Sequence, residues 1–134
     1  YFMKTESGLY VQNIQQSPNH EVVIVTPNWE AAVCEWMTAW VWLWTKDRYL
    51  SVEWCIEGSS SAEGANRKRT NTRLQLFSPK EAWQPMCSKW AGTELSGNVQ
   101  YLRMWMKFKA NEWDGTNKCW LRQLTMGSEQ TVTC

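Results

Sequence analysis

The residues best suited to chemistry lie in the segment Asn98–Lys109, read as NVQYLRMWMKFK, where polar and apolar side chains alternate. This period of two predicts a β-strand with Tyr101, Arg103, Trp105 and Lys107 on one face. Because cations contact phosphates and flat rings stack on unpaired bases, that face could bind single-stranded nucleic acid. A solvent-exposed strand often carries the same residue types for β-propensity and solubility, so this second interpretation stays open.

A basic segment lies earlier in the chain, where residues 66–80 hold five Lys or Arg and no acid. The strand predicted at Arg67–Phe77 separates polar from apolar side chains. Its polar face holds Arg69, Asn71, Arg73 and Gln75, and its other face holds Thr72, Leu74 and Leu76. The whole chain is divided in the same sense: residues 1–63 carry three basic and eight acidic residues, and residues 64–134 carry eleven and five. Such asymmetry indicates a nucleic-acid face or a charge-paired interface.

Two carboxylates, Glu53 and Glu57, share one face of the strand predicted at Tyr49–Glu57, together with Ser51. Their spacing could serve acid–base catalysis, but cross-strand pairing with Arg69 or Arg73 explains them better. We therefore predict that they form ion pairs.

Other chemistry finds little support in the sequence. The chain has one histidine, His20, beside a predicted turn, and it has no nucleotide-binding or HExxH motif. Its five cysteines have no CxxC spacing, which argues against a zinc site. The longest apolar run, Ala31–Trp44, is too short to span a bilayer, and the N-terminus lacks the apolar region of a signal peptide. We expect no enzyme, no cofactor, no metal and no membrane partner.

Eleven tryptophans exceed ordinary usage and indicate a large buried or contact surface. Four of them lie among apolar residues, where a core or an interface is expected: Trp36, Trp40, Trp42 and Trp44. Trp83 and Trp90 lie in a predicted loop and are better candidates for a sugar-binding platform. A tryptophan-rich carbohydrate-binding module is thus an alternative function.

These residues must be positioned by a single domain spanning 1–134. An N-terminal β-hairpin is predicted at 9–26, and the sheet at 31–109 includes a long loop at 78–96 without periodicity. The apolar segment Ala31–Trp44 could be a buried strand or a short helix. A C-terminal helix is predicted at about 111–126. The predicted fold class is α+β, with an antiparallel sheet of about five strands. Because one helix covers such a sheet poorly, we expect an oligomer in which a partner supplies the remaining cover.

The order of these segments resembles the coat proteins of single-stranded RNA bacteriophages, the leviviruses, over nearly the whole chain. The resemblance rests on VTPNWEAAVCEW at 25–36, GSSSAEGANRKR at 58–69 and YLRMWM at 101–106. It implies an intertwined homodimer with a continuous ten-stranded sheet and helices crossing outside. It further implies an icosahedral shell, a virion location, assembly in the bacterial host cytoplasm, and binding of genomic RNA or an RNA hairpin as translational repressor.

The resemblance also implies roles for single residues. Tyr101 would stack on an unpaired base, and Arg103 would contact the RNA. Cys87 is a candidate for an inter-subunit disulfide, with Cys134 or with another copy of itself, and burial as a free thiol is the alternative for it. The predicted RNA-binding residues are Tyr101, Arg103, Lys107, Arg67, Lys68, Arg69, Asn71, Arg73, Ser51 and Glu53. Glu53 and Glu57 depart from the family, which tends to offer small hydroxyls and cations there. A non-assembling RNA-binding sheet protein is the remaining alternative.

Overall fold

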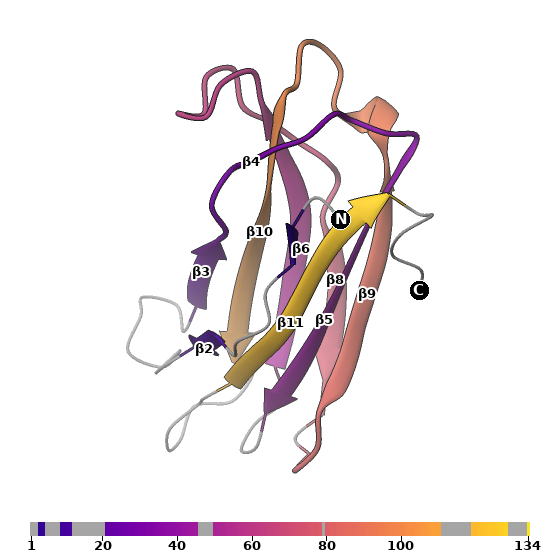
Figure 1. Cartoon of the computed structure of the whole chain (residues 1–134). Helices are drawn as coiled ribbons and strands as arrows, with labels where there is room; N and C mark the ends of the chain where they lie inside the picture. Colours follow the sequence, from indigo (N-terminus) through magenta and orange to yellow (C-terminus); the bar gives the residue numbers. More distant parts are fainter. Residues whose placement is uncertain are drawn as a thin grey trace.

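The computed structural model describes residues 3–4, 9–11, 21–45, 50–78, 80–110, 119–128 and 134. These residues form two antiparallel sheets packed face to face (Figure 1). The strands of sheet A are β1 (Met3–Lys4), β2 (Leu9–Val11), β5 (Trp36–Thr45), β9 (Gln84–Ala91) and β11 (Cys119–Ser128). The strands of sheet B are β3 (Glu21–Val25), β4 (Trp29–Glu30), β6 (Leu50–Ser59), β7 (Lys68–Arg69), β8 (Arg73–Phe77) and β10 (Tyr101–Ala110). A 3₁₀ turn covers Gly92–Glu94.

The chain passes repeatedly from one sheet to the other, so strands that are consecutive in sequence are often in different sheets. Three pairs of short strands each continue one another along a single neighbour: β1 and β2 along β11, β3 and β4 along β10, and β7 and β8 along β6. Counting each pair once leaves eight positions, ordered 1-8-3-6 in sheet A and 2-7-4-5 in sheet B. This is the connectivity of a jelly roll.

The core lies between the sheets and is filled by alternate residues of the long strands. In β10, Leu102, Met104, Met106 and Phe108 are completely buried, which confirms the face predicted for them. In β6, Val52, Trp54 and Ile56 point into the same core, and β5 adds Met37, Ala39, Val41 and Leu43 from the other sheet. The period of two therefore identifies the inner face of each of these strands.

The α+β fold class is wrong, because the described residues contain no α-helix. The C-terminal part of the predicted helix is strand β11, and residues 111–118 lie outside the described residues. A β-bulge explains the misreading: the pairing register with β5 shifts between Arg122 and Thr125, and Gln123 has a φ of 54°. The extra residue places Leu121 and Leu124, three apart, on the same inner face, and this spacing resembles that of a helix.

The predicted hairpin at 9–26 and the ten-stranded dimer are also wrong. Strand β2 pairs with β11 in sheet A, whereas β3 pairs with β10 in sheet B, so these two strands are not partners. The apolar face of sheet B packs against the chain's own sheet A. A helix from a second subunit is not needed to cover it.

Two further segments differ from expectation. The predicted loop at 78–96 contains strand β9. Among the described strands, β9 pairs with β5 alone and is thus an edge strand, which can contain Pro85. The basic strand expected at Arg67–Phe77 is divided into β7 and β8. Between them, Thr70 donates its backbone N–H to the Ile56 carbonyl at 2.9 Å, and its hydroxyl accepts the Ile56 N–H at 3.0 Å.

The apolar segment within 31–44 is a strand rather than a helix from Trp36 onward. In the part of the chain that the structure describes, there is no helix with the length and apolar character needed to cross a membrane.

Candidate functional site

The outer face of sheet B gathers most of the residues that the sequence predicts as RNA-binding. Tyr101, Arg103 and Lys107 alternate with the buried residues of β10 and therefore point outward. Ser51 and Glu53 lie on the outer face of the neighbouring strand β6, where Glu53 is directly opposite Lys107. The structure thus brings these five side chains onto one surface.

In the upper part of this surface, Glu57 accepts hydrogen bonds from two arginines. Arg69 donates to Glu57 Oε2 from Nε at 3.2 Å and from Nη2 at 2.9 Å, and Arg103 Nε donates to Oε1 at 2.8 Å. The Glu57 side chain is only 6% exposed, so its charge is shielded from water and compensated by two guanidinium groups. Arg69 also lies 4.2 Å above the ring centroid of Trp105.

Lower on the same face, the cations are again matched by carboxylates. Lys107 Nζ is 3.6 Å from Glu53 Oε1, and Lys109 Nζ is 3.7 Å from Glu21 Oε1. The prediction that Glu53 and Glu57 form ion pairs is confirmed. Arg69 is the predicted partner for Glu57, whereas Lys107 takes the place expected for Arg69 or Arg73 beside Glu53.

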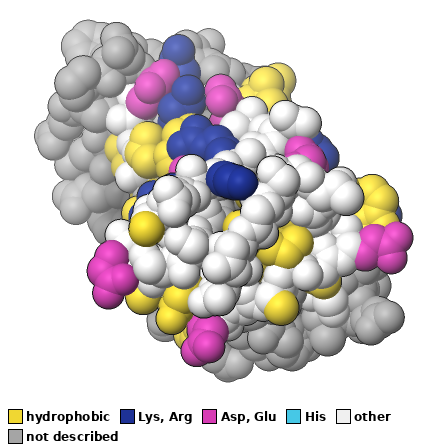
Figure 2. Space-filling view, turned by 90° about the horizontal axis from the view of Figure 1, so that it is seen from above, with side chains coloured by type: hydrophobic (Ala, Val, Ile, Leu, Met, Phe, Trp, Pro, Cys, Tyr) yellow, Lys and Arg dark blue, Asp and Glu magenta, His cyan; other side chains and the backbone are white. Residues whose placement is uncertain are grey.

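Arg67 is close enough to Arg103 and Glu57 to be affected by their charges, and Lys68 is paired opposite Gly58, next to Glu57. The segment 60–67 before them forms a loop at the end of the sandwich that is uppermost in Figure 1. Arg67 Nη1 donates to Asn28 Oδ1 at 3.2 Å, and Lys68 Nζ donates to the Ser96 carbonyl. Burial lowers the pKa of the Arg67 guanidinium, and the charge of Arg103 lowers it further. Figure 2 looks down on this end and shows Lys and Arg side chains grouped beside Asp and Glu side chains.

Arg73 does not lie on this outer surface as predicted, and Asn71 lies in the break between β7 and β8. The Asn71 backbone N–H is bound by Glu94 Oε1 at 2.9 Å, and its carbonyl accepts from Trp90 Nε1 at 2.8 Å. Arg73 is opposite the buried Trp54 and donates to the Lys89 carbonyl at 3.3 Å, so it bridges the two sheets at their edge. The predicted facing of this strand is therefore wrong: Leu74 and Leu76 point outward and Arg73 points inward.

Sequence reasoning missed the surface on the opposite side of the sandwich. Six indoles lie on the outer side of sheet A, which we call the tryptophan face: Trp36, Trp40, Trp42, Trp44, Trp83 and Trp120. Even numbers of residues, four, two and two, separate Trp36, Trp40, Trp42 and Trp44 along the chain. Because successive side chains of a strand point to opposite faces, this spacing places all four on one face.

The indoles of the tryptophan face pack against one another edge to face. The Trp40 and Trp42 rings are 4.7 Å apart at 85°, and the Trp44 and Trp120 rings are 5.0 Å apart at 74°. Trp44, Trp83 and Trp120 line a hollow of about 310 Å³. Arg122 Cζ lies over the face of the Trp83 ring, 4.1 Å from its centroid. Trp90, the other predicted sugar platform, is fully buried and cannot stack on a ligand.

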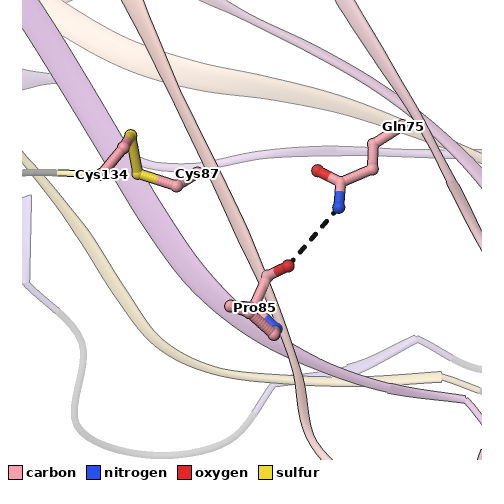
Figure 3. The surroundings of a disulfide bond; sticks show 4 residues. All are labelled: Gln75, Pro85, Cys87 and Cys134. Atoms are coloured by element: carbon pink, nitrogen blue, oxygen red, sulfur yellow. Dashed lines mark hydrogen bonds between the residues drawn. A yellow bond between two sulfur atoms is a disulfide. The ribbon is translucent and has the colours of Figure 1, made fainter.

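A disulfide crosses the same side of sheet A. Cys87 of β9 is bonded to Cys134 of the same chain, with Cα atoms 5.6 Å apart (Figure 3). The bond lies within one chain, whereas the prediction for Cys87 was a bond between subunits, to Cys134 or to another copy of itself. Beside this bond, Gln75 Nε2 donates to the Pro85 carbonyl at 3.4 Å and ties β8 of sheet B to β9 of sheet A.

The three remaining cysteines differ in burial, which predicts an order of thiol reactivity. Burial raises the pKa of Cys55 from 9.0 to about 11, and it also raises the pKa of Cys34 and of the fully buried Cys119. At pH 8 we expect Cys34, which is only half-buried, to react first with a thiol reagent. Cys55 should react more slowly, because its side chain is buried and a pKa of about 11 leaves about a hundredth of the thiolate of an ordinary thiol with a pKa of 9.0. Mass spectrometry of timed labelling checks this order, and equal rates at the two thiols would contradict it.

Comparison with known proteins places the fold. No protein-family model matches the sequence, and no curated protein matches it. A chain in the structure of infectious bursal disease virus, Gx strain, is similar with a TM-score of 0.60 and 12% identity, covering 94% of this chain and 30% of that one. The VP2 subviral particle of the same virus gives 0.54 and 10%, covering 94% and 35%. A CBM4 carbohydrate-binding module gives 0.54 and 8%, covering 90% and 70%.

At these identities the likeness is one of fold. The chain is a β-sandwich of the kind found in these viral chains and in the carbohydrate-binding module, and it spans about a third of the viral chains that it matches. The resemblance to levivirus coat proteins is wrong, since the structure has two packed sheets in place of one sheet with covering helices.

Proposed function

We propose that this chain is a structural subunit of a viral capsid and assembles with copies of itself. The observation that carries the proposal is the tryptophan face, where six indoles gather on the outer side of one sheet. Contiguous aromatic surface of this kind is typical of protein–protein contacts rather than of surfaces that stay in water. The sandwich shared with viral capsid proteins supports the same function.

The test is the size of the purified assembly. We expect particles tens of nanometres across by electron microscopy and light scattering. Trp36→Gln should weaken assembly at least tenfold without unfolding the subunit, because Trp36 is 37% exposed and rests beside Lys89 at 4.8 Å. Trp29→Gln is the matched control, since Trp29 is 40% exposed but belongs to sheet B. A protein that stays a 15.7-kDa monomer at high concentration would disprove the capsid function.

For the packaged nucleic acid, we propose single-stranded RNA bound near Glu57. Three guanidinium groups, from Arg67, Arg69 and Arg103, lie around this one carboxylate, so positive charge remains for phosphates. Arg67→Ala should weaken RNA binding and reduce the slope of log affinity against log salt by about 1. Lys80→Ala, outside the cluster, is the control and should leave the slope unchanged. An unaltered slope in Arg67→Ala would rule out this contact.

The second candidate function is carbohydrate binding at the hollow between Trp44, Trp83 and Trp120. Indole faces stack on sugar rings, and the similarity to a carbohydrate-binding module favours testing it. A glycan array with the wild-type chain and with Trp83→Ala decides this candidate. Binding that disappears in Trp83→Ala would support it, and an array without signal would exclude it for the glycans tested.

A further inference from the structure

The outer face of sheet B exposes aliphatic side chains at both of its edges. Val23 and Val25 of β3 are 52% and 43% exposed, and Leu74 and Leu76 of β8 are 62% and 66% exposed. These are four of the six large hydrophobic side chains exposed among the described residues. Between these two edges lie β10 and β6, which carry the ion pairs described above.

The pairing register places one residue from each strand in a single row across the sheet. Val23 is opposite Lys107, Lys107 is opposite Glu53, and Glu53 is opposite Leu74. The row therefore reads apolar, positive, negative, apolar. Read in the opposite direction, the row is apolar, negative, positive, apolar. A reversed copy therefore places an apolar side chain opposite each apolar one and an opposite charge opposite each charge.

We propose that this face forms the contact of a symmetric dimer, with a twofold axis parallel to the strands. Such an axis reverses the row, so Val23 packs on the partner's Leu74 and Lys107 faces the partner's Glu53. Both contacts occur twice, as an isologous interface requires. The occupant is a second copy of this chain, because its own reversed row supplies an apolar group for each apolar group and an opposite charge for each charge.

The size of the face fits a weak, reversible contact. The four strands lie side by side over the five residues of β3 and β8, about 17 Å, so at a spacing of about 4.8 Å they cover roughly 330 Å² on each subunit. That is less than half of the roughly 800 Å² per partner of a standard specific interface. The contact follows the rows of β3 and β8, whereas Arg103, Glu57 and Arg69 share a row four residues from that of Val23, so the proposed RNA site stays uncovered. The dimer does not depend on the tryptophan face of sheet A, which carries the capsid function.

Charge variants test the intersubunit pair separately from the pair within the chain. Glu53→Lys has two lysines in the row, and Lys107→Glu has two glutamates, so each variant alone should dimerise at least tenfold more weakly than wild type. Mixed together, the two should form a heterodimer, because each carboxylate then faces a lysine of the other subunit. Native mass spectrometry and sedimentation measure both states. Lys80→Glu controls for net charge. No gain on mixing would overturn the proposal.

Cysteine cross-linking tests the geometry. In a Cys34→Ser background, the double variant Val23→Cys/Leu74→Cys should give a covalent dimer on mild oxidation. Within one chain these positions are three strand spacings, about 14 Å, apart, which exceeds the ~7 Å Cα separation that a disulfide allows. Val25→Cys/Leu76→Cys is the matched control, because these residues lie in different rows and should not cross-link. Equal cross-linking of both variants, or a monomeric wild type, would overturn the proposed axis. A dimer that forms no shell would support this contact and reject the capsid function.

Discussion

Replacing Cys134 with serine is expected to lower the free energy of unfolding by about 4 kcal/mol. The bond to Cys87 closes a loop with a sequence separation of 47, and the loop-closure relation gives about this value for that length. The bond also holds Cys134 against β9, which pairs with β5 alone among the strands that the structure describes. Urea titration followed by circular dichroism measures the change.

Two controls separate the disulfide from the side chain itself. Cys34→Ser removes a thiol that forms no disulfide and should change stability little. Reduced wild-type protein should unfold at the same urea concentration as Cys134→Ser. Identical midpoints for oxidised and reduced wild type would contradict the prediction.

The second large effect is expected at Glu57. Glu57→Gln should destabilise the fold by about 3–5 kcal/mol, because it removes one charge from a buried ion network and leaves its partners uncompensated. Arg69 and Arg103 both bond to this carboxylate, and Arg103 is itself only 23% exposed. Thermal and urea unfolding measure the loss.

Glu53→Gln is the matched control on the same strand. Its carboxylate is 37% exposed and its contact with Lys107 is 3.6 Å, so the cost should stay below about 1 kcal/mol. The double variant Glu57→Gln/Arg103→Met should recover part of the loss, because it removes one of the uncompensated cations. Equal losses at Glu53 and Glu57 would show that burial does not set the strength of these pairs.

The sequence was sufficient to predict the strands whose two faces differ in polarity. The alternation in Asn98–Lys109 identified both the strand β10 and its buried face, and the alternation in Tyr49–Glu57 did the same for β6. The ion pairs of Glu53 and Glu57 followed from the same alternation. These predictions succeeded because they depend on neighbours along the chain and on the adjacent strand.

The partner of each strand could not be predicted in this way. Leu9–Val11 and Glu21–Val25 are close in sequence, and hairpin pairing is the common outcome for such neighbours. In the jelly roll they belong to opposite sheets and pair with strands about a hundred and about eighty residues away. The false helix at 111–126 has a different cause, since the bulge at Gln123 alters the period within β11.

The candidate surfaces were predicted in part. The outward face of β10 was identified correctly, but Arg73 was assigned to the wrong face because the break at Thr70 resets the alternation. The tryptophan face was overlooked because both faces of β5 are apolar, and residue type alone did not show which side met the core. Periodicity gives the two sides of a strand, and only the packing of the second sheet decides which side is inside.

The place of β11 in sheet A has a consequence for biosynthesis. This strand lies between β5 and the N-terminal strands β1 and β2, although it is translated last among them. Sheet A therefore cannot form completely until residues 119–128 have been synthesised, because β1, β2 and β5 all pair with β11. Until then, part of the apolar surface of the earlier strands stays exposed. Folding that depends on contacts between distant parts of the sequence is slow, and nascent chains in this state are prone to aggregate or to recruit chaperones. The protein is thus expected to reach its native state only after synthesis has passed Ser128, so any self-assembly follows translation rather than accompanying it.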